Sequence, residues 1–116
     1  MKVNVKATGF DLTPSIGLYI DEKLASLGKF VKRLDAEGAA QMWIEVGKTT
    51  RHHHKGPVFR AEADLRLPKK ILRAEQESYD LRTAIIAVRN KLLLEIEKYK
   101  TRFETDKRSI RRIRRK

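Results

Sequence analysis

Four stretches of the chain alternate apolar with polar residues, which is the period of a strand that buries one face. They cover residues 2–7, 41–46, 59–67 and 70–75, and Pro68 with Lys69 forms a hairpin turn between the last two. The side chains expected to face a core are Val3, Val5, Ala7, Met42, Ile44, Val46, Phe59, Ala61, Ala63, Leu65, Leu67, Leu72 and Ala74.

Two other stretches repeat apolar residues at steps of three and four, the period of an amphipathic helix. The first begins at Thr13, a favourable N-cap, and Pro14 follows where a missing N–H costs nothing. Its apolar stripe is Ile16, Ile20, Leu24, Leu27, Val31 and Leu34. The second begins near Tyr79 or Asp80, and its stripe is Leu81, Ala84, Ile85, Val88, Leu92, Ile96, Tyr99 and Phe103.

The predicted order of elements is therefore β-α-β-β-β-α. Because each strand has one apolar face and each helix one apolar stripe, we predict a two-layer α+β fold with both helices on one face of a four-stranded sheet. A chain of 116 residues can bury one modest core, so we expect a single folded domain over residues 1–104. Residues 105–116 are too polar to bury a core and are predicted to form a disordered basic tail.

Charge narrows the class of partner. The chain has 27 lysines and arginines against 15 acidic residues, a net charge of +12, and seven of the basic residues lie in 105–116. Such an excess favours a polyanion, with nucleic acid ahead of an anionic membrane surface. Cysteine is absent, which excludes disulfides. The sequence shows no apolar run near the roughly 20 residues of a membrane span and no signal-peptide pattern, so we expect a cytoplasmic protein.

The candidate binding residues are cations beside the two helical stripes. They are Lys23, Lys29, Arg82, Arg89, Lys91, Lys98, Lys100 and Arg102. If the helices lie side by side, these flanks merge into one cationic surface suited to phosphates. The alternative is an ordinary solvated helix face with local ion pairs, such as Glu95 with Lys98. The overall imbalance and the basic tail favour RNA.

Other chemistry receives less support. The three histidines at 52–54 are adjacent, so their side chains cannot all point at one metal ion, and no cysteine completes a site. Glu62 and Asp64 lie two residues apart on one strand, which suits acid–base catalysis but also suits ion pairs with residues such as Arg73. We therefore expect no enzyme, no metal and no cofactor. Trp43 is the one aromatic residue placed for base stacking on the outer sheet face. We therefore expect RNA to contact the helices rather than this face of the sheet.

Three aliphatic residues of the second helix leave two readings open. Ile86, Leu93 and Leu94 fall partly outside the main apolar stripe. They indicate either a wider core face or a small exposed strip for a partner.

The chain resembles the family of ribosome hibernation-promoting factors, also called ribosome-associated inhibitors or protein Y, in its short form. The resemblance covers about residues 1–103. It rests on HKGPVFRAEADLRLP with ILRAE, on the helix from Asp80 with its Ala84-Ile85, Lys91-Leu92 and Lys98-Tyr99-Lys100 steps, and on Thr13-Pro14 with Lys23-Leu24.

The resemblance implies a role at the ribosome. A member of this family would bind the small ribosomal subunit and its rRNA through basic helix residues and occupy the channel for mRNA and tRNA. It would block translation and protect idle ribosomes under stress or in stationary phase. The partners expected are the small subunit and its rRNA, with no membrane and no small-molecule substrate, and the protein would be monomeric off the ribosome.

Some positions depart from the family pattern. Arg82 stands where the family commonly has tyrosine, and Ile86 and Asn90 replace usual acids, which makes the helix more cationic. Lys69 takes the usual glycine of a Pro-Gly turn, so we expect a type I rather than a type II turn.

Two alternatives to the ribosomal role stay open. One is a general double-stranded-RNA-binding or RNA-chaperone module. The other is a metal-dependent hydrolase that uses the histidine loop with Glu62 and Asp64.

Overall fold

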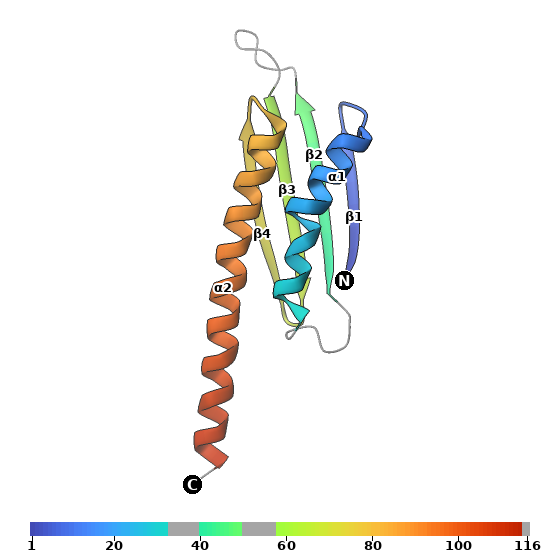
Figure 1. Ribbon diagram of the computed structural model, residues 1–116. Coiled ribbons are helices and arrows are strands. Elements are labelled where there is room, and N and C mark those ends of the chain that lie inside the picture. Colours follow the sequence, from blue (N-terminus) through green and yellow to red (C-terminus); the bar gives the residue numbers. More distant parts are fainter. Residues whose placement is uncertain (33–39, 50–57, 115–116) are drawn as a thin grey trace.

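The computed structural model describes residues 1–32, 40–49 and 58–114, with the side chains of residue 49 and residues 103–114 outside the description. The strands are β1 (Lys2–Thr8), β2 (Gln41–Thr49), β3 (Val58–Leu67) and β4 (Lys70–Ser78). The helices are α1 (Pro14–Lys23), a 3₁₀ helix η1 (Ala25–Phe30) and α2 (Leu81–Arg114). Both helical segments lie on one face of the sheet (Figure 1), which confirms the predicted two-layer α+β fold.

The sheet has the order β1-β2-β3-β4. Strands β1 and β2 are parallel, and α1 with η1 forms the crossover between them, while β2, β3 and β4 are antiparallel neighbours. The register aligns Val5 with Ile44 and Ile44 with Ala63, so the apolar faces of these strands coincide. The core face is thus continuous across the sheet.

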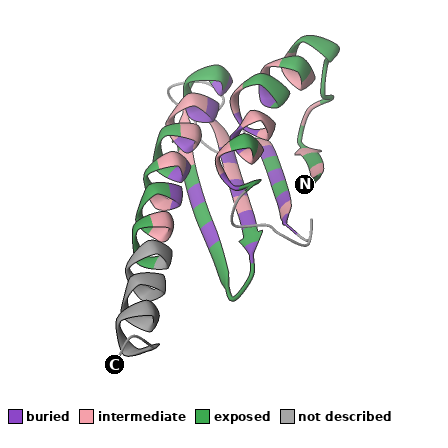
Figure 2. Cartoon of the chain, turned by 60° about the horizontal axis from the view of Figure 1, so that its bottom comes forward, coloured by how far each residue is buried: buried purple, intermediate pink, exposed green. Residues whose placement is uncertain are grey.

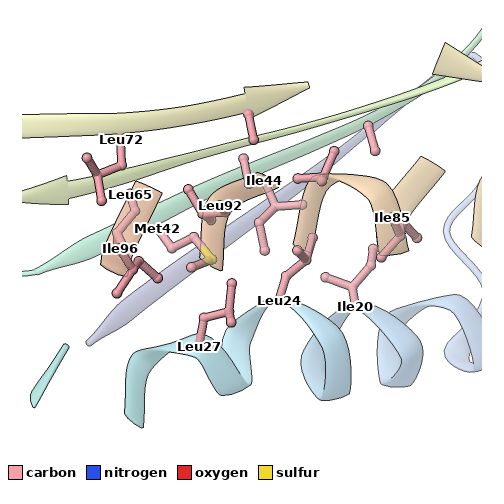
Figure 3. Close-up of a cluster of buried hydrophobic side chains, with 14 of the residues drawn as sticks. Ile20, Leu24, Leu27, Met42, Ile44, Leu65, Leu72, Ile85, Leu92 and Ile96 are labelled. Carbon is pink, nitrogen blue, oxygen red and sulfur yellow. The ribbon is translucent and has the colours of Figure 1, made fainter. Parts of the chain in front are cut away.

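Sequence periodicity explains the core. Figure 3 shows side chains of α1 and η1, the strands and α2 meeting between the two layers, and Leu24, Leu65 and Leu92 are fully buried there. The predicted α2 stripe is buried from Leu81 to Ile96 and half-buried at Tyr99. Phe103 of that stripe lies outside the described side chains. Figure 2 shows the resulting division, with buried positions on the facing sides of the layers.

β1 is covered less than the other strands. Val3 and Ala7 are half-buried, but Val5 remains 38% exposed although we expected it to face the core. β1 lies at the edge of the sheet, whereas α2 contacts β3 and β4 most. The edge position therefore leaves Val5 partly in solvent.

The first helix is shorter than predicted. The Thr13 side-chain oxygen accepts a hydrogen bond from the Ile16 amide at 3.2 Å, as an N-cap does, but the α-helix ends at Lys23 and η1 follows. Leu24, Leu27 and Phe30 recur at steps of three, which suits the three residues per turn of a 3₁₀ helix. The Ser26 hydroxyl also donates to the Glu22 carbonyl, a bond that bends helices. Leu34, the last predicted member of the stripe, lies outside the described residues.

The prediction of a type I turn in the hairpin between β3 and β4 is wrong. Leu67 pairs with Lys70 across the turn, and Lys69 has φ of 64°. A positive φ at this third position, after proline, belongs to a type II turn. The tight pairing of the two strands imposes this positive φ on Lys69, although glycine would adopt it without strain.

The second helix begins at Leu81 and is capped by Asp80. The Asp80 carboxylate accepts hydrogen bonds from the Thr83 hydroxyl at 2.7 Å and the Thr83 amide at 3.2 Å. These hydrogen bonds lower the pKa of Asp80 below its ordinary value. At its other end the helix continues to Arg114 and extends beyond the sheet (Figure 1). The backbone of 105–114 is thus helical where we expected a disordered tail, and the boundary at residue 104 stays a prediction.

Candidate nucleic-acid interface

The cations of α2 lie on two opposite flanks of the helix. At 3.6 residues per turn, Arg82, Arg89 and Lys100 project to one side of the buried stripe. Contacts to Tyr19 of α1 and Phe30 of η1 identify this side as the one that faces the first helical segment. Lys91, Lys98 and Arg102 project to the other side, on which Lys91 contacts β4.

The first group of contacts joins the two helices around Tyr19. The Lys23 ammonium lies 5.7 Å from the centre of the Tyr19 ring, and the Arg82 guanidinium carbon lies 5.4 Å from it. Arg82 also donates a hydrogen bond to the Ser15 hydroxyl at 3.1 Å. Within about 6 Å, a cation is attracted to the ring face. Tyr19 therefore holds one cation from each helix.

A second group repeats the arrangement around Phe30. The Lys29 ammonium lies 5.1 Å from the centre of the Phe30 ring, and the Lys100 ammonium of α2 lies 5.6 Å from it. Both the Tyr19 and Phe30 rings are half-buried. We call Tyr19, Lys23, Lys29, Phe30, Arg82, Arg89 and Lys100 the inter-helix face.

The cations of the inter-helix face have little acidic compensation, since the charge of Arg82 acts on Asp80 without an ion pair between the two side chains. In the part of the chain that the structure describes, Lys23, Lys29, Arg82, Arg89 and Lys100 form no ion pair. Arg89, half-buried between the two groups by helix position, donates only to the Asn90 side chain at 3.2 Å. Cations that are grouped without ion pairs leave their positive potential available to an external anion.

The opposite flank of α2 is tied to the protein. The Lys91 ammonium donates to the Glu75 carbonyl at 2.9 Å and to the Gln76 side-chain oxygen at 2.8 Å. Lys98 pairs with Glu95 at 3.5 Å, the local ion pair that the sequence suggested. A shallow depression between β4 and α2 is lined by these lysines with Glu62, Glu75 and Glu95. This flank is therefore balanced in charge, and the structure does not merge it with the inter-helix face.

Arg102 is the last of the eight predicted binding residues. It is exposed, and by helix position it continues the flank of Lys91 and Lys98. The structure thus brings five of the predicted residues together on the inter-helix face and separates three from them.

The outer face of the sheet carries paired charges. Arg60 pairs with Glu62 at 3.0 Å and with Glu75, and the Arg73 side chain lies 3.6 Å from Asp64. Burial raises the pKa of Asp64 above its ordinary value, the charge of Glu62 adds to the rise, and Arg73 opposes it. Asp64 therefore has the cross-strand ion pair that its non-catalytic interpretation predicts, whereas Glu62 pairs with Arg60 of its own strand.

Trp43 lies 45% exposed on the same outer face. Its ring is contacted by the Arg66 guanidinium, 5.6 Å from the ring centre. No second exposed aromatic side chain joins it on the outer face of the described strands. The outer face of the described strands therefore does not offer several aromatic rings on which successive bases could stack.

The aliphatic residues beside the buried stripe of α2 differ in how far they are buried. Ile86 and Leu93 are half-buried, and Leu93 packs against the core cluster, while Leu94 is 57% exposed. The wider core face is the better interpretation for Leu93, and Leu94 points to solvent.

Among the described residues, no group of three or more histidine, cysteine or acidic side chains is placed to hold a metal ion. The histidines at 52–54 lie outside those residues. None of the described helices combines the length and the apolar character needed to cross a bilayer.

Sequence reasoning missed the two aromatic rings of the inter-helix face. The Tyr19–Lys23 spacing of four residues on one helix is a signal for their contact. The partners on α2 carry no such signal, because the contact depends on how α1, η1 and α2 align side by side.

The fold and the inter-helix face define a small basic α+β protein with a cationic surface that forms no ion pairs within the described residues. The chain belongs to the family described as Sigma 54 modulation protein / S30EA ribosomal protein, whose model matches residues 3–104. This match confirms the family expected from the sequence.

Individual relatives agree with this assignment. The chain is 31% identical over 104 residues to a ribosome hibernation promotion factor of Lactococcus lactis subsp. cremoris, covering 88% of this chain and 51% of that protein. The chain thus spans about half the length of that curated relative.

Solved structures support the fold. The N-terminal domain of Thermus thermophilus Protein Y has a TM-score of 0.59 and 24% identity, covering 85% of this chain and 99% of that one. A ribosomal subunit interface protein of Coxiella burnetii has a TM-score of 0.62 and 18% identity, covering 87% of this chain and 99% of that one. At these identities the likeness concerns the fold alone.

Proposed function

We propose that this protein is a ribosome hibernation factor that binds the small ribosomal subunit through its inter-helix face. The observation that carries the proposal is the set of five cations along the two helical segments that form no ion pair within the described residues. RNA phosphates supply the missing negative charge. Membership of the S30EA family supports a ribosomal partner over other RNAs.

The proposed mechanism is steric. The protein occupies the channel of the small subunit where mRNA and tRNA bind, and translation stops while the protein remains there. No bond is made or broken, so the protein has no need of a catalytic group or a cofactor. The compact two-layer body acts as a wedge, and phosphate contacts hold it in place. Such a protein acts in the cytoplasm, where its ribosomes are.

The basic C-terminal end adds to this anchoring. Residues 105–116 carry seven lysines and arginines, and α2 carries the backbone of 105–114 beyond the sheet (Figure 1). We propose that this extension strengthens binding through sequence-independent attraction to RNA. Removing it would lower affinity without changing which subunit is bound.

Co-sedimentation with purified subunits tests the proposal. We expect saturation near one copy per small subunit, weaker binding as salt rises, and displacement by tRNA. Binding to both subunits without saturation or competition would overturn the proposal and favour a general double-stranded-RNA-binding or RNA-chaperone module. Binding that saturates but is insensitive to tRNA would contradict the channel as the site.

A further inference from the structure

We infer that Tyr19 and Phe30 are positioning residues, each holding a pair of cations as one phosphate-binding site. The inference rests on the proposed RNA-binding function and assigns a role to aromatic residues within it. Each ring joins one lysine of the first helical segment to one cation of α2: Lys23 and Arg82 at Tyr19, Lys29 and Lys100 at Phe30.

The rings solve a problem of like charges. Two cations that face each other across a helix interface repel, and flexible side chains would turn away from each other into solvent. An aromatic ring attracts both of them. The hydrogen bond from Arg82 to Ser15 at 3.1 Å further restricts one member of the first pair. The pairs are therefore held before any anion arrives, which reduces the ordering cost of binding.

The two sites have a defined separation. α2 rises 1.5 Å per residue, so Arg82 and Lys100 lie about 27 Å apart along its axis. Arg89 lies between them on the same flank and provides an intermediate positive charge. This arrangement fits a length of RNA backbone that runs along the inter-helix face and contacts a pair of cations at each end. A single small anion would engage only one of the pairs.

A different role for the rings gives a different measurable result. Aromatic side chains also stack on unpaired bases of RNA. A stacking ring contributes to affinity without a phosphate contact, so its loss leaves the salt dependence unchanged. A ring that positions cations contributes through phosphate contacts, so its loss makes the salt dependence shallower.

The test measures affinity for purified small subunits over a range of salt concentrations. The variants are Tyr19→Leu and Phe30→Leu, with Tyr19→Phe and Phe30→Tyr as matched variants that keep a ring. Thermal unfolding of each variant checks that the fold is retained. We expect each leucine variant to lose about three-fold in affinity, the scale of a cation–π contact. Its salt slope should become shallower by about 0.7 to 0.9 per released phosphate contact, and the ring-keeping variants should match the parent.

The outcomes separate this inference from the proposed function. If the parent protein fails to bind small subunits, the proposed function is wrong. If the parent binds and the leucine variants keep both affinity and slope, the positioning role is wrong. A lower affinity with an unchanged slope also overturns it, because it assigns the rings to base stacking. A leucine variant that unfolds is replaced by methionine at the same position, and the same slope comparison applies.

Discussion

The ammonium group of Lys91 hydrogen-bonds the backbone carbonyl of Glu75 at 2.9 Å, joining α2 to the exposed edge of the sheet. β4 is an edge strand, and its free carbonyls would otherwise face solvent or another chain. Lys91 therefore serves the fold, whereas Lys100 of the same helix contacts Phe30 on the inter-helix face. Two lysines with similar sequence surroundings thus have different structural settings.

Replacing Lys91 with methionine tests this difference. The change keeps the alkyl part of the side chain and removes the hydrogen bonds to Glu75 and Gln76. We expect the free energy of unfolding to fall by about 1 kcal/mol, the net value of a protein hydrogen bond. The matched Lys100→Met variant should keep its stability and lose more RNA affinity than Lys91→Met. Denaturant unfolding and small-subunit binding measure the two effects. The reverse order of RNA affinities would contradict the division of α2 into two flanks.

The buried stripe of α2 supports a second prediction. Leu92 is fully buried between the layers (Figure 3). Leu94, two residues later, is 57% exposed. Leu92→Ala should lower the free energy of unfolding by about 2–5 kcal/mol, because it leaves a cavity. Leu94→Ala should change it by less than about 0.5 kcal/mol. Equal effects in denaturant unfolding would show that the helix does not pack as described.

Periodicity predicts the core of this protein but not the length of its first helix. Spacings of three and four identified Ile20, Leu24, Leu27 and Val31 as buried, and all four are. The change from α-helix to 3₁₀ helix at Ala25 alters backbone hydrogen bonds without moving these side chains out of the core. Apolar spacing alone does not distinguish the two helix types.

The candidate site was predictable in part. Counting charges located the cations on the two helices, but it did not separate Lys91 from Arg89. Their separation depends on which flank of α2 faces α1, and that follows from the packing of both helices on the sheet. Likewise, the preference of lysine for negative φ argued against a type II turn at Lys69, and the register between Leu67 and Lys70 overrides that preference.

The turn at Lys69 gives a third prediction. A residue other than glycine pays about 1 kcal/mol or more for a left-handed conformation. Lys69→Gly relieves this strain but raises the conformational entropy of the unfolded chain. We therefore expect the free energy of unfolding to rise by only about a few tenths of a kcal/mol. Lys69→Val should lower stability, since a β-branched residue resists positive φ. As a control, Lys70→Gly lies in β4 and should destabilise. Chemical denaturation ranks the variants, and a destabilised Lys69→Gly would contradict the positive φ.

Two aspartates should respond to pH in opposite directions. The pKa of Asp80 is lowered by its hydrogen bonds to Thr83, so its stabilising contribution is present above the unfolded pKa of about 3.9 and is lost as pH falls through the folded pKa. The pKa of Asp64 is raised by burial, so its charged form opposes folding at neutral pH, and this penalty is relieved as pH falls through the folded pKa.

Asparagine variants separate the two contributions. Asp80→Asn keeps an acceptor for Thr83 and removes the titration, so stability should fall less steeply with acid than in the parent. Asp64→Asn removes the partly buried charge and should make the acid-side fall in stability steeper. Thermal unfolding between neutral pH and about pH 3, a range that spans the ordinary carboxylate pKa, measures both slopes. Changes of the same sign in the two variants would refute this assignment.

Photo-crosslinking on small subunits tests most directly whether the helical layer faces RNA. Leu18 of α1 is 64% exposed in the helical layer, and Ile71 of β4 is 44% exposed on the outer sheet face. A photoreactive amino acid at either position leaves the core and every cation in place. We predict crosslinks to the RNA of the small subunit from position 18 and none, or far fewer, from position 71. Crosslinks mainly from position 71 would place the sheet against the RNA and contradict the assignment of the inter-helix face.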